Sequence, residues 1–215
     1  MVFSTLYYKN SRRCMKPTHL TPLFFTCLFI TILLYSSHAV ANGSIQVRSF
    51  KLEAVENGYS VSVDSEIELN PTLEQALKKS VTLYFVAKFT LVEPRWYWFN
   101  HEVARIKTRV GLRYYTLTRQ YHLSDRTSSK YFFTLKEALQ AIQKVYNEPL
   151  RVKSELSDTK DYHAELRLWL DLTRMPKPFQ VEALGSSAWN LTSERLQWRM
   201  KLPSPEYPFQ FSYHP

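Results

Sequence analysis

Alternation of apolar and polar residues is the feature that most limits what this chain can fold into. It is clearest in residues 59–69, where apolar or small side chains occupy every second position. The positions between them include three acids, Asp64, Glu66 and Glu68. A period of two residues is typical of a β-strand that buries one face and exposes the other. This segment is therefore predicted to be a half-buried strand with an acidic outer face.

The chain just before this strand is expected to form a hairpin with it. Asn57-Gly58 supplies the positive φ angles that a two-residue type I′ turn needs. Residues 45–55 are the predicted partner strand, and their apolar phase slips between Val47 and Phe50. One extra residue in a strand shifts the phase in this way, so a β-bulge is expected there.

Several further segments alternate in the same way or are apolar throughout, which predicts more strands. They are residues 81–92, 103–115, 117–123, 130–133, 162–170 and 195–202. The first of these is apolar on both faces and is therefore expected to be a central strand. Two short helices are expected at capping boxes that begin at Thr72 and Thr134. The predicted fold class is mainly β: an antiparallel β-sandwich, Ig-like or barrel-like, of about eight or nine strands with two short helices.

Residues 1–41 follow none of these patterns and are expected to be a secretory signal peptide. Four cations and no acid precede an apolar stretch of 16 residues, 20–35, and Ala39-Val40-Ala41 follows it. This order predicts cleavage between Ala41 and Asn42 and a periplasmic or secreted location. The alternative is an uncleaved N-terminal membrane anchor, although the stretch is shorter than the roughly 20 apolar residues of a typical spanning helix.

Removal of this leader changes the charge and the cysteine content of the chain. The 215 residues have a formal net charge of +9, and loss of the four leader cations leaves +5. A charge this small, together with export, argues against nucleic acid as a partner. Both cysteines, Cys14 and Cys27, lie in the leader, so the mature domain has no disulfide or thiol chemistry. The histidines lack the spacing of a zinc site, and no catalytic, metal or cofactor motif is predicted.

The mature domain is expected to cover residues 42–202. Within it, Met175-Pro176-Lys177-Pro178 is interpreted as a stiff connector because proline fixes the backbone. Residues 203–215 carry four prolines and show neither a helical nor a strand pattern. They are expected to form an extended or mobile C-terminal tail.

A stripe of cations is the first candidate binding surface. It consists of Arg105, Lys107, Arg109 and Arg113, which the alternation of residues 103–115 places on one face of a strand. Such a stripe could bind an anionic ligand, a phospholipid headgroup or an acidic partner. The alternative interpretation is an ordinary outer sheet face whose charges are balanced by neighbours, with the acids of the hairpin as the expected partners.

An aromatic run supplies the second candidate surface. Trp96, Tyr97 and Trp98 follow Arg95, and Phe99 makes four consecutive aromatic residues. Their rings could stack on a sugar or anchor a protein partner, since Trp and Tyr contribute much of the energy of binding interfaces. The alternative is that they pack into the core from both sides of a strand end.

Taken together, six short stretches resemble a family of proteobacterial secreted proteins known as domain of unknown function 4390. They are LNPTLEQAL (69–77), YF (84–85), PRWYW (94–98), LTRQY (117–121), TLKEAL (134–139) and PKPFQ (176–180). They span nearly the whole mature domain, and the proline-rich tail looks like an addition to the family pattern. The resemblance implies an envelope protein, with a membrane sensor as a possible partner. It brings no catalytic residues.

These observations favour a non-enzymatic binding or interaction domain that is exported to the periplasm. Its expected partners are an envelope protein or membrane sensor, and an anionic ligand or lipid headgroup. The alternative hypothesis is a periplasmic hydrolase or carbohydrate-active enzyme in which Trp96 and Trp98 hold a glycan. That enzyme would need two carboxylates roughly 5–10 Å apart.

Overall fold

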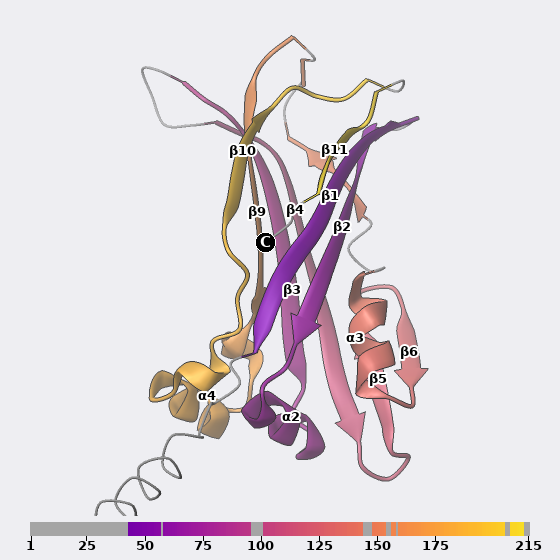
Figure 1. Ribbon diagram of the computed structural model, residues 1–215, viewed down its shortest axis with the longest axis vertical. Helices are drawn as coiled ribbons and strands as arrows, with labels where there is room; N and C mark the ends of the chain where they lie inside the picture. The colour runs from indigo at the N-terminus through magenta and orange to yellow at the C-terminus, as the bar shows by residue number, and fades with distance from the viewer. Residues whose placement is uncertain are drawn as a thin grey trace, which may run out of the picture. The chain divides into compact units, whose positions relative to one another are not determined.

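The structure, a computed structural model, describes residues 43–56, 58–95, 101–143, 148–153, 156–157, 159–204 and 207–212. The predicted leader and the aromatic run from Trp96 to Phe99 lie outside the described residues. The described residues form 11 strands in two antiparallel sheets, with three α-helices (Figure 1). The sheets form a sandwich rather than a closed barrel, which confirms the predicted fold class, a mainly β antiparallel sandwich.

The smaller sheet contains the predicted hairpin and the last strand of the chain. Its strands are β1 (Ser44–Val55), β2 (Gly58–Glu68), β7 (Glu148–Pro149) and β11 (Phe209–Ser212). They lie in the order β11-β1-β2-β7. The register of β1 against β2 shifts between Val47 and Ser49, so the predicted bulge is confirmed. Gly58 has φ +129° and pairs with Val55, so it is the first residue of β2. The predicted turn at Asn57-Gly58 is therefore wrong, because Gly58 already belongs to the strand.

The larger sheet is built around one central strand. Its members are β3 (Leu83–Glu93), β4 (His101–Tyr115), β5 (Gln120–Ser124), β6 (Ser129–Phe132), β8 (Arg151–Val152), β9 (Tyr162–Leu170) and β10 (Leu196–Met200). The order is β10-β9-β3-β4-β5-β6, and β8 pairs with β4. β3 therefore has a strand on each side and is buried along most of both faces, which confirms the prediction made from its apolar residues.

An aromatic cluster between the sheets joins them. Phe50 of β1 lies at its centre and is fully buried. Its ring centroid is 5.0 Å from that of Phe89 on β3 and 4.9 Å from that of Trp198 on β10. On its own sheet it stacks on Phe211 of β11 at 5.6 Å. Because its partners come from both sheets, this one side chain contributes to the packing between them.

The helices cover one end and one side of the sandwich. Their bounds are α2 (Pro71–Lys78), α3 (Leu135–Gln143) and α4 (Lys177–Leu184), with 3₁₀ helices η2 (Leu172–Arg174) and η3 (Ser187–Trp189). α2 and α4 lie at one end of the sheets (Figure 1). α3 contacts β2 of the smaller sheet and β5 of the larger one. None of the described helices is long and apolar enough to cross a membrane.

The two predicted helix caps had different outcomes. At α3 the Thr134 hydroxyl accepts a hydrogen bond from the Glu137 N–H at 3.2 Å, and Glu137 accepts one from the Thr134 N–H at 3.3 Å. This is the reciprocal capping box that the sequence predicted. At α2 the prediction was wrong, because Asn70 and not Thr72 is the N-cap residue. Pro71 then occupies the first helical position, where its missing N–H costs nothing.

Two segments interpreted as irregular form regular structure. α4 begins at Lys177 with Pro178 in its first turn, so the expected stiff connector is partly helical. In the tail, Phe209–Ser212 is the strand β11, which pairs with β1 from Ser49 to Leu52. The expectation that the tail has no strand was therefore wrong. Three of its four prolines precede the strand and Pro215 follows it, so no proline interrupts the four residues of β11.

Candidate binding surface

The outer face of the larger sheet is strongly basic. The burial of alternate residues shows which side chains of β3, β4, β9 and β10 face outward. Seven of them are cations, and we call this set the basic face: Lys88, Arg105, Lys107, Arg109, Arg113, Arg167 and Arg199. In these four strands, all fully described, the outward-facing carboxylates are Glu102 and Glu165.

Three of the cations lie directly side by side at the centre of the basic face. In the register of the sheet, Lys88 on β3 pairs with Lys107 on β4 and with Arg167 on β9. We call these three residues the cationic row. Directly opposed side chains have Cβ atoms about 4.5–5.5 Å apart, and like charges in such positions destabilise a sheet. An anion bound over the row would relieve this repulsion.

The cationic row is bordered by an indole. Trp169 faces outward on β9, with its ring centroid 5.9 Å from the Lys107 Nζ and 5.8 Å from the Arg167 Cζ. Both cations are within the range of a cation–π interaction. The ring also lies beside Val86, whose pairing with Trp169 and Arg109 leaves it fully buried on this face. The centre of the face thus combines positive charge with a flat apolar surface.

Two cations of the predicted stripe are held by carboxylates of the same face. Arg109 donates to the Asp171 carboxylate at 2.9 Å. Arg105 and Lys153 both bond to Glu102. Burial alone would raise the pKa of Glu102, but the hydrogen bonds from these two cations hold it below its usual value. Lys88 and Lys107 have no carboxylate partner among the described residues.

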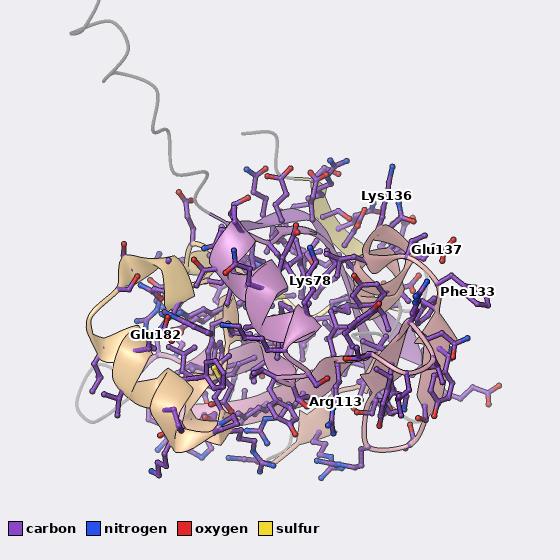
Figure 2. All side chains as sticks on the ribbon, turned by 90° about the horizontal axis from the view of Figure 1, so that it is seen from below. Lys78, Arg113, Phe133, Lys136, Glu137 and Glu182 are labelled. Carbon is purple, nitrogen blue, oxygen red and sulfur yellow. The ribbon has the colours of Figure 1, made fainter. Side chains whose placement is uncertain are left out.

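The expected balance by the hairpin acids is wrong. Asp64, Glu66 and Glu68 lie on β2, which belongs to the other sheet. Glu66 pairs there with Arg48. The two outer faces of the sandwich therefore have different charge, one basic and one rich in acids. In Figure 2, which looks along the strands, Arg113 marks the side of the molecule on which the basic face lies, and Lys136 of α3 lies away from that side.

The structure brings some of the predicted site residues together and leaves others apart. Arg105, Lys107, Arg109 and Arg113 share one face of β4, as the alternation predicted. Arg113 lies further along the strand, with its guanidinium 5.2 Å from the Tyr115 ring centroid. Arg95 is exposed two residues after the end of β3.

The aromatic candidates Trp96, Tyr97 and Trp98 lie outside the described residues, so their surface role stays a prediction. The hydrolase alternative depends on Trp96 and Trp98, so it also stays a hypothesis. Within the described residues, no group of three or more His, Cys, Asp or Glu side chains is arranged to hold a metal ion.

Sequence reasoning missed Lys88 and Arg167. Lys88 is the one charged residue in the apolar segment 81–92. A lone lysine in a central strand is a usable signal, because a buried charge needs a partner or an outlet to solvent. The alternation of residues 162–170 likewise places Arg167 on the outer side. Their alignment with Lys107 depends on strand register and could not be seen in any one segment.

Asp171, which accepts the hydrogen bond from Arg109, gives the folding stability a testable pH dependence. Burial works to raise its pKa, but hydrogen bonds from Thr173 and the Arg109 guanidinium lower the pKa below the ordinary value. A carboxyl whose pKa is lowered by folding stabilises the fold above its unfolded pKa of about 4. That contribution is lost as the pH falls through the pKa that the carboxyl has in the folded protein.

We therefore expect Asp171→Asn to destabilise the protein most at neutral pH. The difference in free energy of unfolding between the variant and the wild type should shrink as the pH falls below about 4. Urea denaturation over a series of pH values measures it. A difference that stays constant down to the lowest pH at which both proteins fold would contradict this assignment.

Comparison with known proteins identifies the domain but assigns it no activity. No curated protein and no solved structure gives a significant match to the chain. A family model described as "Domain of unknown function (DUF4390)" matches residues 42–199. The match runs from β1 into β10, ends one residue before the end of that strand, and does not include the tail that carries β11. It covers most of the chain, so this protein belongs to the DUF4390 family.

Proposed function

We propose that this chain is an exported, non-enzymatic binding domain of the cell envelope whose basic face binds phosphate-bearing lipid headgroups. The cationic row is the observation that carries the proposal, because Lys107, Lys88 and Arg167 are aligned in register with no carboxylate between them. Charged phosphates attract such a surface at a membrane.

Three further features support a membrane surface as the ligand. Trp169 lies beside the row, and indoles favour the boundary between headgroups and acyl chains. The basic face belongs to one sheet, so its cations can contact one extended surface at the same time. The predicted leader and the predicted periplasmic location would bring the domain to a membrane with anionic lipids.

Vesicle binding tests the proposal. We expect the purified protein to sediment with vesicles that contain phosphatidylglycerol and to stay in solution with vesicles of phosphatidylcholine alone. The double variant Lys88→Gln/Lys107→Gln should weaken binding by roughly 30-fold, since each basic residue near an anionic surface contributes about 1 kcal/mol. Removing two like charges from the sheet should not reduce folding stability.

A matched double variant controls for net charge. Lys78 on α2 and Lys136 on α3 are exposed and lie off the basic face (Figure 2). Lys78→Gln/Lys136→Gln removes the same charge and should weaken vesicle binding by less than about threefold. The proposal is wrong if the two double variants weaken binding equally, or if binding does not depend on anionic lipid.

A further inference from the structure

The end of the sandwich that carries α2 and α4 exposes several apolar side chains to solvent. Leu117 lies in the turn between β4 and β5, residues 116–119, and is 100% exposed. Val181 and Leu184 of α4 are 68% and 90% exposed. Figure 1 shows the turn and α4 at the same end of the sheets. We call these three residues the apolar tip, and only something outside the domain can shield them from water.

α4 is fixed to the domain with two of its apolar residues on the outer side. The Phe179 ring packs against Trp189 of η3, with the ring centroids 5.8 Å apart. The Gln180 Nε2 donates to two main-chain carbonyls just before the helix, at 2.7 and 2.9 Å. Val181 and Leu184 are three residues apart, which makes them neighbours on the surface of a helix. These contacts therefore hold the two side chains out toward solvent together.

The turn that carries Leu117 is also tied to the domain. The Thr116 and Ser80 hydroxyls are 3.3 Å apart and share a hydrogen bond, which joins the turn to the chain just after α2. Arg119 completes the turn with φ +55°, a left-handed conformation that is uncommon for a residue other than glycine. Leu117 is fully exposed at this fixed position, so its side chain adds nothing to the packing of the domain.

The apolar tip adjoins the basic face. Arg174 of η2, the short helix before α4, has its Cζ 6.0 Å from the ring centroid of Tyr84, which faces outward on β3. On β4, Arg113 of the basic face lies over Tyr115, the last residue of the strand and two residues before Leu117. α4 and the turn thus both begin where the basic face ends. A membrane that binds the basic face can reach the apolar tip as well.

The segments that carry the apolar tip are basic. Four exposed cations flank its residues in the chain: Arg113, Arg119, Arg174 and Lys177. Residues 113–119 and 172–185 are all described, and Glu182 is the one acid among them. Apolar side chains flanked by cations are typical of protein surfaces that lie in the interface of an anionic bilayer. The cations attract the charged headgroups, and the apolar side chains gain by leaving water for the acyl chains.

We propose that the apolar tip inserts among the acyl chains of an anionic bilayer while the basic face binds the headgroups. This inference rests on the proposed function, because it takes the same membrane as the partner. It adds an orientation: the domain meets the bilayer with the β4–β5 turn and α4 deepest, and with the other end of the sheets away from it. It also assigns a role to Leu117, Val181 and Leu184, which the headgroup contacts leave unexplained.

A fluorescent label that reports its own depth tests the inference. The whole chain with Cys14→Ser and Cys27→Ser receives either Leu117→Cys or Leu184→Cys, and the new thiol is labelled with nitrobenzoxadiazole. With vesicles that contain phosphatidylglycerol, we expect the emission of both labels to shift to the blue and to rise about twofold or more. Lipids with a nitroxide on the acyl chain should quench it. The same label at Lys136→Cys on α3, off the basic face, should show neither effect.

Unlabelled variants measure what insertion contributes to binding. Leu117→Ser/Leu184→Ser should weaken sedimentation with these vesicles about tenfold, because each leucine side chain loses favourable transfer out of water. The control Val55→Ser/Phe133→Ser removes two other exposed apolar side chains and should change binding less than about twofold. All four positions are exposed, so folding should be little affected.

The outcomes separate this inference from the proposed function. If the protein sediments with the vesicles but the labels at 117 and 184 stay in water, the inference is overturned and headgroup binding by the basic face stands. Equal weakening by the two serine variants would overturn it in the same way. If the protein does not bind vesicles of anionic lipid at all, the inference and the proposed function are both wrong.

Discussion

Replacing Phe50 by alanine should lower the free energy of unfolding by about 3–5 kcal/mol, which is the usual cost of truncating a buried phenylalanine. The ring is fully buried and contacts Phe89 and Trp198 on the larger sheet and Phe211 on the smaller one. Its removal opens a cavity at the interface between the sheets, and aromatic pairs add to the area that is lost. Urea denaturation at neutral pH measures the effect.

Phe133→Ala is the matched control for this prediction. Phe133 lies just after β6 and is 77% exposed. Its truncation removes the same atoms from the surface, where substitutions usually change stability by less than about 0.5 kcal/mol. Similar losses in the two variants would show that Phe50 does not join the sheets as described.

Asn70→Ala should lower the free energy of unfolding by about 2–3 kcal/mol. The Asn70 Oδ1 accepts a hydrogen bond from the Leu73 N–H at 2.9 Å, and its Nδ2 donates to the Ala188 carbonyl at 2.6 Å. Asn70 is 4% exposed, so water cannot easily replace either bond. Loss of a cap costs about 1 kcal/mol, and a buried polar group left without a partner costs about 1–3 kcal/mol. Urea denaturation again measures the change.

Two variants separate the cap from the link to η3. Asn70→Asp keeps an oxygen for the Leu73 N–H but has no N–H to donate to Ala188, so it should be destabilised through the second bond. Thr72→Ala removes the residue that the sequence marked as the cap, and it should change the free energy of unfolding by less than about 0.5 kcal/mol. A loss at Thr72 equal to that at Asn70 would contradict the assignment of Asn70 as the N-cap.

The strands were predictable where their pattern is long and has one period. In β4 the alternation runs through most of 15 residues, so both its buried face and its cationic stripe follow from the sequence. The bulge in β1 was visible because an extra residue shifts the apolar phase. The cap of α3 was also visible, since both partners, Thr134 and Glu137, lie three residues apart in the chain.

The missed elements are short and depend on distant partners. β11 has four residues, and its alternation of Phe209 and Phe211 with polar residues is too brief to predict a strand among prolines. It forms because β1 offers an edge to pair with and the aromatic cluster takes up both rings. α4 was missed because its apolar residues do not share one face of a helix, which is the pattern that predicts a helix from sequence. In the structure, Val181 and Leu184 of α4 are exposed.

The sequence by itself determined the local geometry of the long strands: where they lie, where β1 bulges, and which face of β4 carries cations. These properties depend on neighbours within a few residues, and the backbone period encodes them directly. The tertiary structure alone decided that Lys107, Lys88 and Arg167 form one row and that the hairpin acids lie on the other sheet. Strand order and register are set by packing between segments far apart in the chain, and a single strand carries no record of its neighbours.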